Sequence, residues 1–408
     1  MTGAILTLNA GSSSIKYSLY TCEHGLDRFA KGEISGIDTH PVFNSVDANG
    51  LKQNVSIDAS PTDKHDDLFR WLIAWIRQEY PALAIIAAGH RVVHGGRDFT
   101  GPMLLTPKKI EALTELSPLA PDHQPLNLAG VRNIAERWPN IPQIACFDTA
   151  FHRTQPNIAQ LYALPRELIN DGVIRYGFHG LSYEYIAAEL PKHAGPRAGG
   201  RVIVAHLGHG ASMCAMIGRR SQATSMGFTA LDGLVMAQRC GNLDPGVVLY
   251  LLRERKMEVH AIEELLSHRS GLLGVSGVSS DMRTLLESDD IHAKEAVDLF
   301  VYRAVREVGS LASAIGGLDV LVFTGGIGEN SAEIRARIVS GCAWLGMKID
   351  NEENQSGASR ISARGSVIDV FALPTDEESV IARHVMSIIR QKNVRHNLCG
   401  HSLGDGSE

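Results

Sequence analysis

Hydrophobic residues recur along this chain in short runs that end at glycine or serine. Three apolar runs lead into such turns, at residues 4–14, 202–212 and 319–330. The first two turns continue directly into another apolar run, at residues 15–20 and 213–217, and this order predicts two strand–turn–strand hairpins. Because the hairpins lie about half a chain apart, they suggest a duplicated domain. An unduplicated α/β protein would also contain several strands that end at glycine, so that alternative stays open.

Helical periodicity appears between these runs. One amphipathic helix face is predicted from the spacing of Leu68, Trp71, Leu72, Trp75 and Ile76. We interpret its two tryptophans as core residues rather than a ligand platform, since this stripe is the usual core-facing pattern. A second helix is predicted to begin at Asn330, with Glu333 as its capping-box partner. Strands interleaved with helices indicate the α/β class.

The composition narrows the class of protein. A chain of 408 residues has room for two or three domains, and its net charge of -6 argues against a generic nucleic-acid binder. The six cysteines form no Cys-x-x-Cys pair and are expected to be reduced thiols. No apolar run approaches the roughly 20 residues of a membrane helix, and the start of the sequence does not resemble a signal peptide, so we expect a cytoplasmic protein without a membrane partner. Residues 391–408 are polar and are expected to be poorly ordered.

Two glycine-rich segments are candidates for phosphate or nucleotide binding. Residues 9–16 (NAGSSSIK) combine a tight turn with three hydroxyl groups and a lysine, although the Walker A spacing is absent. An ordinary hairpin with a serine-rich turn explains this segment equally well. Residues 324–330 (TGGIGEN) follow an apolar strand and precede a helix, where backbone N–H groups and the helix dipole favour phosphate.

Three further segments place basic side chains beside glycines. Arg91 lies in residues 89–96 (GHRVVHGG), after an apolar run at residues 82–88, and an arginine at a strand end suits a phosphate or carboxylate. His179 lies in residues 176–180 (YGFHG), and Arg239 lies in residues 236–245 (MAQRCGNLDP). A solvated basic loop and a structural histidine are the plainer interpretations of these segments.

Taken together in this order, the segments resemble the acetate and propionate kinase family, from residue 6 to about residue 383. Residues 9–17 resemble the N-terminal signature of the family, and residues 176–182 resemble its second signature. The resemblance implies two duplicated ribonuclease-H-like α/β domains of the actin, sugar-kinase and Hsp70 superfamily, with the active site in an interdomain cleft. The expected N-terminal domain comprises residues 1–150 plus a C-terminal helix within residues 376–392. Residues 151–375 would form the nucleotide-binding domain, and residues 393–408 a flexible tail.

The resemblance also assigns roles to single residues. The matching catalytic residues are Arg91, Asp148, His179 and Arg239, and the matching metal-site residues are Asn9 and Glu377. The positions matching the walls of the carboxylate pocket are Val93, Asp122, Phe178 and Ala230. The positions matching phosphate and nucleotide contacts are Ser12, Ser14, Lys16, His206, Leu207, Gly208, His209, Gly210, Asp281, Met282, Arg283, Gly326, Ile327, Gly328, Glu329 and Asn330.

Three residues depart from the family pattern. His209 replaces the usual asparagine of the second phosphate loop, and Ala230 replaces a proline of the pocket wall. Asp122 stands where the family has a leucine, and an unpaired carboxylate in an apolar pocket would be costly. We expect Asp122 to point away or to be paired, and the alternative is a polar substrate.

The implied activity is reversible phosphoryl transfer between ATP and acetate, giving acetyl phosphate and ADP, with Mg²⁺ (or Mn²⁺) and a homodimeric enzyme. Val93 and Phe178 favour acetate because they would line a small apolar pocket. Propionate or another short-chain carboxylate is the alternative substrate within the same chemistry. An actin-like nucleotide-binding module without acyl-phosphate chemistry is the alternative from another class.

Overall fold

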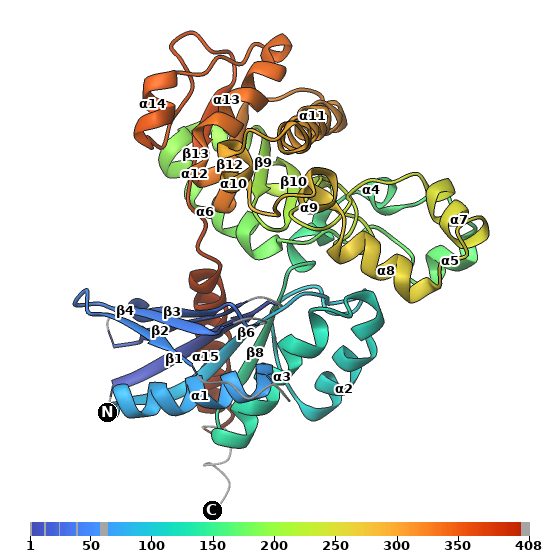
Figure 1. Cartoon of the computed structure of the whole chain (residues 1–408). Helices are drawn as coiled ribbons and strands as arrows, with labels where there is room; N and C mark the ends of the chain where they lie inside the picture. Colours follow the sequence, from blue (N-terminus) through green and yellow to red (C-terminus); the bar gives the residue numbers. More distant parts are fainter. Residues whose placement is uncertain (1, 12–13, 24, 38–39, 58–63, 401–408) are drawn as a thin grey trace, which may run out of the picture. The chain divides into compact units, whose positions relative to one another are not determined.

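The computed structural model describes residues 2–11, 14–23, 25–37, 40–57 and 64–400. Its internal contacts divide the chain into two compact units, Met1–Ala150 with Asp376–Glu408, and Phe151–Thr375. Each unit contains one β-sheet with helices packed on it (Figure 1). No helix among the described residues is long and apolar enough to cross a membrane.

The first unit is built on a sheet with the strand order β5-β4-β3-β2-β1-β6-β8-β7. Its elements are β1 (Thr2–Ala10), β2 (Ser14–Thr21), β3 (Asp27–Ser35), β4 (Val42–Asp47), β5 (Lys52–Ser56), α1 (Lys64–Glu79), β6 (Leu83–Val92), β7 (Met103–Leu104), α2 (Pro107–Glu115), the 3-10 helix η1 (Ser117–Leu119), α3 (Gln124–Arg137), β8 (Gln143–Phe147) and α15 (Glu377–Gly400). β1 and β2 pair antiparallel, as expected for the first hairpin, and β1, β6 and β8 run parallel.

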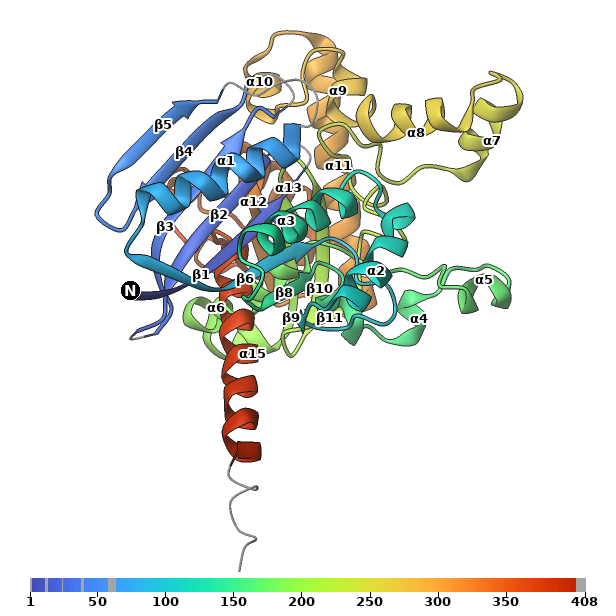
Figure 2. The ribbon, with the colours of Figure 1, turned by 90° about the horizontal axis from the view of Figure 1, so that it is seen from below.

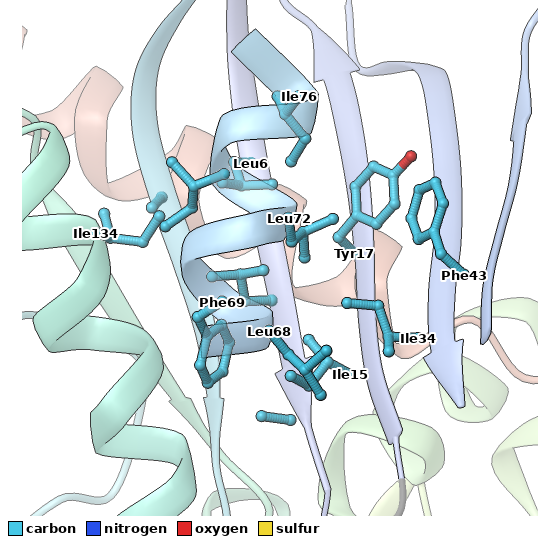
Figure 3. Packing of buried hydrophobic residues seen from close by; sticks show 14 of the residues in the cluster. Leu6, Ile15, Tyr17, Ile34, Phe43, Leu68, Phe69, Leu72, Ile76 and Ile134 are labelled. Atoms are coloured by element: carbon cyan, nitrogen blue, oxygen red, sulfur yellow. The ribbon is translucent and has the colours of Figure 1, made fainter. Parts of the chain in front are cut away.

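The core of this unit lies between the sheet and α1. Leu68, Leu72 and Ile76 are buried on one face of the helix, at the spacing that predicted it. They pack with strand residues such as Tyr17 and Phe43 (Figure 3). The two tryptophans of α1 are partly buried and pack against the same cluster, with rings near Phe43. Their expected role as core residues is therefore confirmed.

Helix α15 covers the opposite face of this sheet from α3. A Cβ atom on Gly89 of β6 would come within 2.4 Å of Ile381 and 2.6 Å of Val385, so glycine is needed for this close approach. On the next residue of β6, the His90 side chain faces Gly130 of α3. Helix α15 continues to Gly400, so the helix expected to end within residues 376–392 is longer, and part of the expected flexible tail is helical. Residues 401–408 lie outside the described residues.

The second unit is built on a sheet with the order β11-β10-β9-β12-β13. Its elements are α4 (Asn157–Gln160), α5 (Arg166–Asn170), α6 (Gly180–Ala194), η3 (Gly195–Gly199), β9 (Arg201–Leu207), β10 (Ala211–Ile217), β11 (Arg220–Thr224), α7 (Pro245–Arg253), α8 (Val259–His268), α9 (Gly271–Ser276), α10 (Met282–Glu287), α11 (Ile291–Ala314), β12 (Val320–Thr324), α12 (Gly325–Asn330), α13 (Ala332–Gly341), η4 (Ala343–Leu345), α14 (Asn351–Ser356) and β13 (Asp369–Ala372), preceded by η2 (Ala150–Thr154) at the boundary between the units.

The two sheets repeat one topology. β9 and β10 form the second predicted hairpin, β11 pairs antiparallel with β10, and β12 runs parallel to both β9 and β13. The same pattern of directions joins β3, β2, β1, β6 and β8 in the first unit. The duplication suggested by the two hairpins is therefore present in the fold.

The start of one helix, α13, was predicted one residue too early. The glycine-rich segment 325–330 is itself the short helix α12, and the following helix α13 is capped by Ser331 rather than Asn330. The Ser331 hydroxyl accepts a hydrogen bond from the backbone N–H of Ile334 at 3.4 Å. Because a serine hydroxyl reaches the third residue of the helix readily, it serves as the N-cap in place of its neighbour.

Candidate active site

In the first unit, three adjacent parallel strands deliver polar side chains to one edge of the sheet. Asn9 and Arg91 lie at the ends of β1 and β6, and Asp148 directly follows β8. In the strand register, Leu8 pairs with His90 and Arg91 pairs with Cys146, so the three ends are aligned. Carboxyl ends of parallel strands are the usual ligand-binding edge of an α/β sheet.

Arg91 is held at this edge by hydrogen bonds along its whole guanidinium group. Its Nε donates to Asp148 Oδ1 at 3.0 Å, its Nη2 donates to Asp148 Oδ2 at 2.5 Å, and its Nη1 donates to Asn9 Oδ1 at 3.1 Å. Burial alone would lower the pKa of Arg91, but the carboxylates of Asp148, Glu377 and Glu378 outweigh it and raise that pKa above its ordinary value. Arg91 is therefore a fixed positive charge.

Glu377, the first residue of α15, joins the same group through Asn9. The Asn9 amide Nδ2 donates to Glu377 Oε2 at 3.0 Å and to Glu378 Oε1 at 3.4 Å. Burial raises the pKa of Glu377 to about 7, with Arg91 opposing this shift and the negative charges of Asp148 and Glu378 adding to it. A cation bound here would favour the ionised form of Glu377.

The donor atoms of this group suit a magnesium ion. Mg²⁺ binds carboxylate and amide oxygens and commonly uses one or two carboxylates together with substrate phosphates. Glu377, Asp148 and the Asn9 amide supply such oxygens at one edge of the sheet. The residues that the structure describes contain no group of three or more histidine, cysteine, aspartate or glutamate side chains arranged to hold a metal by themselves. The two carboxylates and the amide of this group therefore match the donor types of Mg²⁺ but do not form such a cluster.

The loop after β6 is braced by buried amide side chains. The Val93 N–H donates to Asn127 Oδ1 at 2.9 Å, and the Asn127 amide donates in turn to the Ala10 carbonyl at 2.7 Å. Gln124 holds the next residue of the loop from both sides. Asp122, just before α3, is exposed to solvent, so its carboxylate does not carry the desolvation cost of an apolar pocket.

In the second unit, His179 is fixed at the start of α6. Its backbone is left-handed, with φ of 57°, and its Nδ1 lies 2.8 Å from the Ser212 hydroxyl on β10. The ring stacks on His206, with centroids 4.3 Å apart, and His206 Nδ1 lies 2.8 Å from the Ser182 hydroxyl. A strained backbone with so many fixed contacts is typical of a functional position.

His152 supports the segment before His179 and was not among the predicted site residues. Its Nε2 lies 2.8 Å from the Phe178 carbonyl oxygen, and its Nδ1 lies 3.0 Å from the Ser221 hydroxyl. A Cβ atom on Gly177 would come within 2.6 Å of the His152 ring, and the φ of Gly177 is 76°. Burial lowers the pKa of His152 to about 4. A neutral imidazole therefore holds this loop from inside the unit.

Arg239 and His179 both approach the loop between β9 and β10. A Cβ atom on Gly210 would lie 3.1 Å from His179 Nε2 and 3.9 Å from Arg239 Nη1. Arg239 Nη1 donates to the Ala230 carbonyl at 3.1 Å, and the Ala237 N–H donates to the His209 carbonyl at 3.1 Å. The structure thus brings together four predicted positions, His179, Arg239, Gly210 and Ala230, while Phe178 is fully buried beside them in the chain.

A pocket of about 420 Å³ lies beside this loop within the second unit. It is lined by Gly208, His209, Asp281, Met282, Arg283, Leu286, Gly326, Ile327, Asn330 and Ser331. Eight of these are predicted nucleotide positions, and only Leu286 and Ser331 are not. Leu286 lies one helical turn after Met282, and this spacing is the one signal that could have revealed it. The pocket combines backbone, charged and apolar surfaces, as nucleotide sites do.

Other predicted phosphate positions lie outside this lining. Glu329 points instead toward the backbone, where its Oε1 accepts from the N–H groups of Gly325 at 2.9 Å and Thr375 at 3.1 Å. Ser14 and Lys16 belong to β2 of the first unit, and Ser12 lies outside the described residues. The remaining predicted positions absent from the lining are His206, Leu207, Gly210 and Gly328.

Comparison with known proteins finds relatives over almost the whole chain. Residues 4–383 match the Acetokinase family. The chain is 55% identical over 394 residues to an acetate kinase of Rhodopseudomonas palustris, covering 94% of this chain and 98% of that protein.

Two solved structures share the fold. An acetate kinase of Porphyromonas gingivalis is 36% identical, with a TM-score of 0.83 over 95% of this chain and 100% of that one. A propionate kinase of Francisella tularensis is also 36% identical, with a TM-score of 0.87 over 94% and 99% of the two chains. The expected duplicated α/β fold is thereby confirmed, and the chain belongs to the acetokinase family.

Proposed function

We propose that this protein catalyses reversible phosphoryl transfer between ATP and acetate, giving acetyl phosphate and ADP. The observation that carries the proposal is the arrangement around Arg91. A guanidinium group has five N–H donors, and the described contacts with Asp148 and Asn9 engage three of them, which leaves two for a ligand. The Arg91 side chain is 15% exposed, so a small anion can reach it. The acetate kinases among its relatives support the same chemistry.

The reaction requires neutralisation of negative charge on the two substrates rather than a strong base. The acetate oxygen is already ionised, so it attacks the γ-phosphorus of ATP directly, an oxygen–phosphorus bond forms, and the bond to the β–γ bridging oxygen breaks as ADP leaves. Arg91 neutralises the carboxylate and the transferring group as these two anions approach each other. Asp148 and Asn9 keep the guanidinium plane in one orientation.

The residues of the second unit are assigned to the nucleotide and the transferring phosphoryl group. The Nε2 atom of His179 and the guanidinium of Arg239, both near Gly210, would donate to phosphoryl oxygens as negative charge builds up on them. The pocket beside Gly208 and Gly326 would bind the nucleotide, because glycines permit close approach of its phosphates to backbone N–H groups.

The proposed magnesium site is formed by Glu377, Asn9 and Asp148. Bound together with the nucleotide, Mg²⁺ supplies positive charge to the phosphate oxygens. The carboxylate of Glu377 and the amide oxygen of Asn9 would hold its hydrated shell, and Arg91 keeps the Asp148 carboxylate in one orientation. Mn²⁺, which also accepts oxygen ligands, is the alternative ion.

Acetate is the proposed acid because the expected pocket walls Val93 and Phe178 are buried, apolar side chains. Propionate is the nearest competitor, since a propionate kinase shares the fold and Ala230 leaves more space than the family's proline. Asp122 is exposed, which favours the interpretation that it does not shape the pocket. One extra methylene is worth only about 1–3 kcal/mol of discrimination, so a measurable side activity on propionate is expected.

An acyl-phosphate assay tests the proposal directly. Purified protein is incubated with ATP, Mg²⁺ and acetate, propionate, butyrate or glycolate, and hydroxylamine traps any acyl phosphate. The highest kcat/KM with acetate supports the proposal. Preference for a longer or hydroxylated acid would make Asp122 and Ala230 specificity residues. Nucleotide binding without acyl phosphate from any acid would identify an actin-like nucleotide-binding module and overturn the proposal.

A homodimer is proposed from an exposed apolar arm of the second unit. Helices α7 and α8 extend away from the sheet of their unit in both views (Figures 1 and 2). The exposed apolar side chains on this arm include Leu243, Val247, Leu249, Tyr250 and Val259, and no residue of α7 is buried. Several exposed apolar side chains on one arm are typical of an interface.

Light scattering after size-exclusion chromatography tests the interface. The wild type is expected to be a dimer, and a double change, Leu249→Glu with Tyr250→Glu, should yield a folded monomer. A monomeric wild type would contradict the proposed homodimer.

The described cysteines are free thiols, which suits the cytoplasmic location proposed here.

A further inference from the structure

A chain of buried hydroxyl groups leads to the ring of His179. Ser212 Oγ lies 2.8 Å from His179 Nδ1, and Tyr183 OH lies 2.5 Å from Ser212 Oγ. Tyr183 and Ser212 are both fully buried. Ser212 sits on β10 opposite His206, the residue that stacks on His179, and Tyr183 lies one helical turn after His179 on α6. Two rigid elements therefore fix the hydroxyl chain.

The direction of the hydrogen bonds follows from the Tyr183 end. A tyrosine hydroxyl carries one hydrogen, and among the described residues Ser212 is the partner that the structure gives it. Because a buried hydroxyl hydrogen without an acceptor is costly, Tyr183 donates to Ser212. The Ser212 hydroxyl hydrogen also needs an acceptor, and His179 Nδ1 is the other partner that the structure gives it among the described residues, so Ser212 donates to Nδ1.

This direction determines which nitrogen of neutral His179 carries the hydrogen. With Nδ1 accepting from Ser212, the hydrogen resides on Nε2, which is the atom that faces Gly210 beside Arg239. An Nε2–H group can donate to a phosphoryl oxygen, whereas a bare Nε2 would repel it. The tautomer of a histidine is commonly set by the hydrogen bond at its other nitrogen.

We propose that Tyr183 and Ser212 are positioning residues for phosphoryl transfer, and that their hydroxyl chain holds His179 in the tautomer with hydrogen on Nε2. The inference rests on the proposed function for its effect on catalysis, but the tautomer itself does not. His152, which holds the Phe178 carbonyl, fixes the backbone of the same segment, so ring and backbone are controlled from separate sides. Ser212→Ala would remove the donor to Nδ1 and would allow the other tautomer.

Nitrogen NMR of protein labelled with ¹⁵N-histidine tests the tautomer without any assay of activity. The His179 signals are assigned as those missing from His179→Gln. The wild type should show a protonated Nε2 and an unprotonated Nδ1, and Ser212→Ala should shift population toward protonated Nδ1. A wild-type Nδ1 that carries the hydrogen, or a tautomer unchanged in Ser212→Ala, would overturn the proposal even if acetate kinase activity is absent.

Kinetics then separate positioning from simple packing. Tyr183→Phe and Ser212→Ala should each lower kcat by about tenfold or more, with the KM for ATP changed less than about threefold. Because both changes break one chain, the double variant should lose no more activity than Ser212→Ala alone. Tyr176→Phe is the matched control, since it removes another buried phenol of this unit, which donates to the Gly172 carbonyl at 2.9 Å. Equal kcat losses in the control, or additive losses in the double variant, would indicate a merely structural role.

Discussion

The two units repeat one sheet topology but carry different chemistry at corresponding strand ends. The end of β1 holds Asn9 and the end of β6 holds Arg91. In the second unit, the end of the corresponding β9 holds His206, and β12 leads into the glycine-rich segment 325–330. The first unit gathers charges that compensate one another, and the second gathers neutral hydrogen bonds and exposed backbone. Duplication therefore fixed the place of the site residues in each unit, while their chemistry diverged.

This difference changes what a substitution should do. In the first unit each charge is the partner of another, so removing one leaves its neighbour buried and uncompensated. In the second unit many contacts are made by backbone or by hydroxyl groups, so a side-chain change is expected to affect function more than stability.

The largest effect is expected from Arg91→Ala. Loss of an arginine that stabilises a transferring phosphoryl group should lower kcat by about 10³-fold or more. The structure adds a stability cost, because Asp148 is only 1% exposed and would lose its cation, at about 3–5 kcal/mol. A loss of stability is therefore expected together with the loss of activity. Steady-state kinetics and denaturant unfolding measure the two effects.

The double variant Arg91→Ala with Asp148→Asn separates the loss of activity from the loss of stability. Removing both charges should restore much of the stability but none of the activity, because the uncompensated carboxylate is gone while the guanidinium is still missing. Recovery of activity in the double variant would show that Arg91 acts only by neutralising Asp148.

Arg239→Ala should have the second-largest effect on kcat. Loss of a donor aimed at developing negative charge typically lowers kcat by about 10²–10³-fold. The Ala230 carbonyl would lose one hydrogen-bond donor, so the stability loss should be only about 1 kcal/mol. Arg239→Lys is the control for charge without the guanidinium fork. A kcat within threefold of the wild type for Arg239→Ala would remove Arg239 from the proposed mechanism.

Glu377→Gln should alter the pH dependence of stability. Because burial raises the pKa of Glu377 from 4.5 to about 7, the folded state binds this proton more tightly than the unfolded state does. The resulting stabilisation is complete below about pH 4.5 and is lost as the pH rises through about 7, on the order of 2–3 kcal/mol. Thermal unfolding in a chelator from pH 5 to 8 should show this slope in the wild type and its loss in Glu377→Gln.

Metal binding should follow the opposite trend with pH. The ionised carboxylate is the metal ligand, so the affinity for Mg²⁺ with nucleotide should fall as the pH drops below about 7 and should be about 10–100-fold weaker in Glu377→Gln. Glu378→Gln is the matched control, since its neighbouring carboxylate makes only a 3.4 Å contact with Asn9. Equal effects of the two variants would contradict the special role of Glu377.

The sequence predicted what local pattern and turn chemistry determine. Both hairpins, the α1 helix and the strand leading into residues 325–330 follow from apolar periodicity and glycine, and those signals are short-range. The start of α13 was misplaced by one residue because Asn330 and Ser331 are both competent caps.

Such local patterns could not predict the residues that support the site. Tyr183 and Ser212 are 29 positions apart, and His152 lies 26 positions from Phe178, so only the packed sheet brings them together. No composition or spacing rule distinguishes them from ordinary core residues. The candidate residues Arg91 and His179 were accessible to sequence reasoning because each lies near glycines, whereas Asp148 and Glu377 were assigned only from the family resemblance.

The smallest effect is expected from His209→Asn, which restores the residue usual in the family. Loss of hydration and the positive charge of Arg239 both lower the pKa of His209, so its imidazole is neutral at pH 7 and donates one hydrogen bond, as an amide can. The KM for ATP should therefore change by less than about threefold, and the ratio between variant and wild type should stay constant from pH 6.5 to 8. Gly210→Ala is the contrasting variant, because its Cβ would lie 3.1 Å from His179 Nε2 and should lower kcat far more. A large, pH-dependent effect of His209→Asn with a mild effect of Gly210→Ala would assign phosphate recognition in the second unit to a side-chain charge rather than to backbone, and would erase the contrast with the first unit.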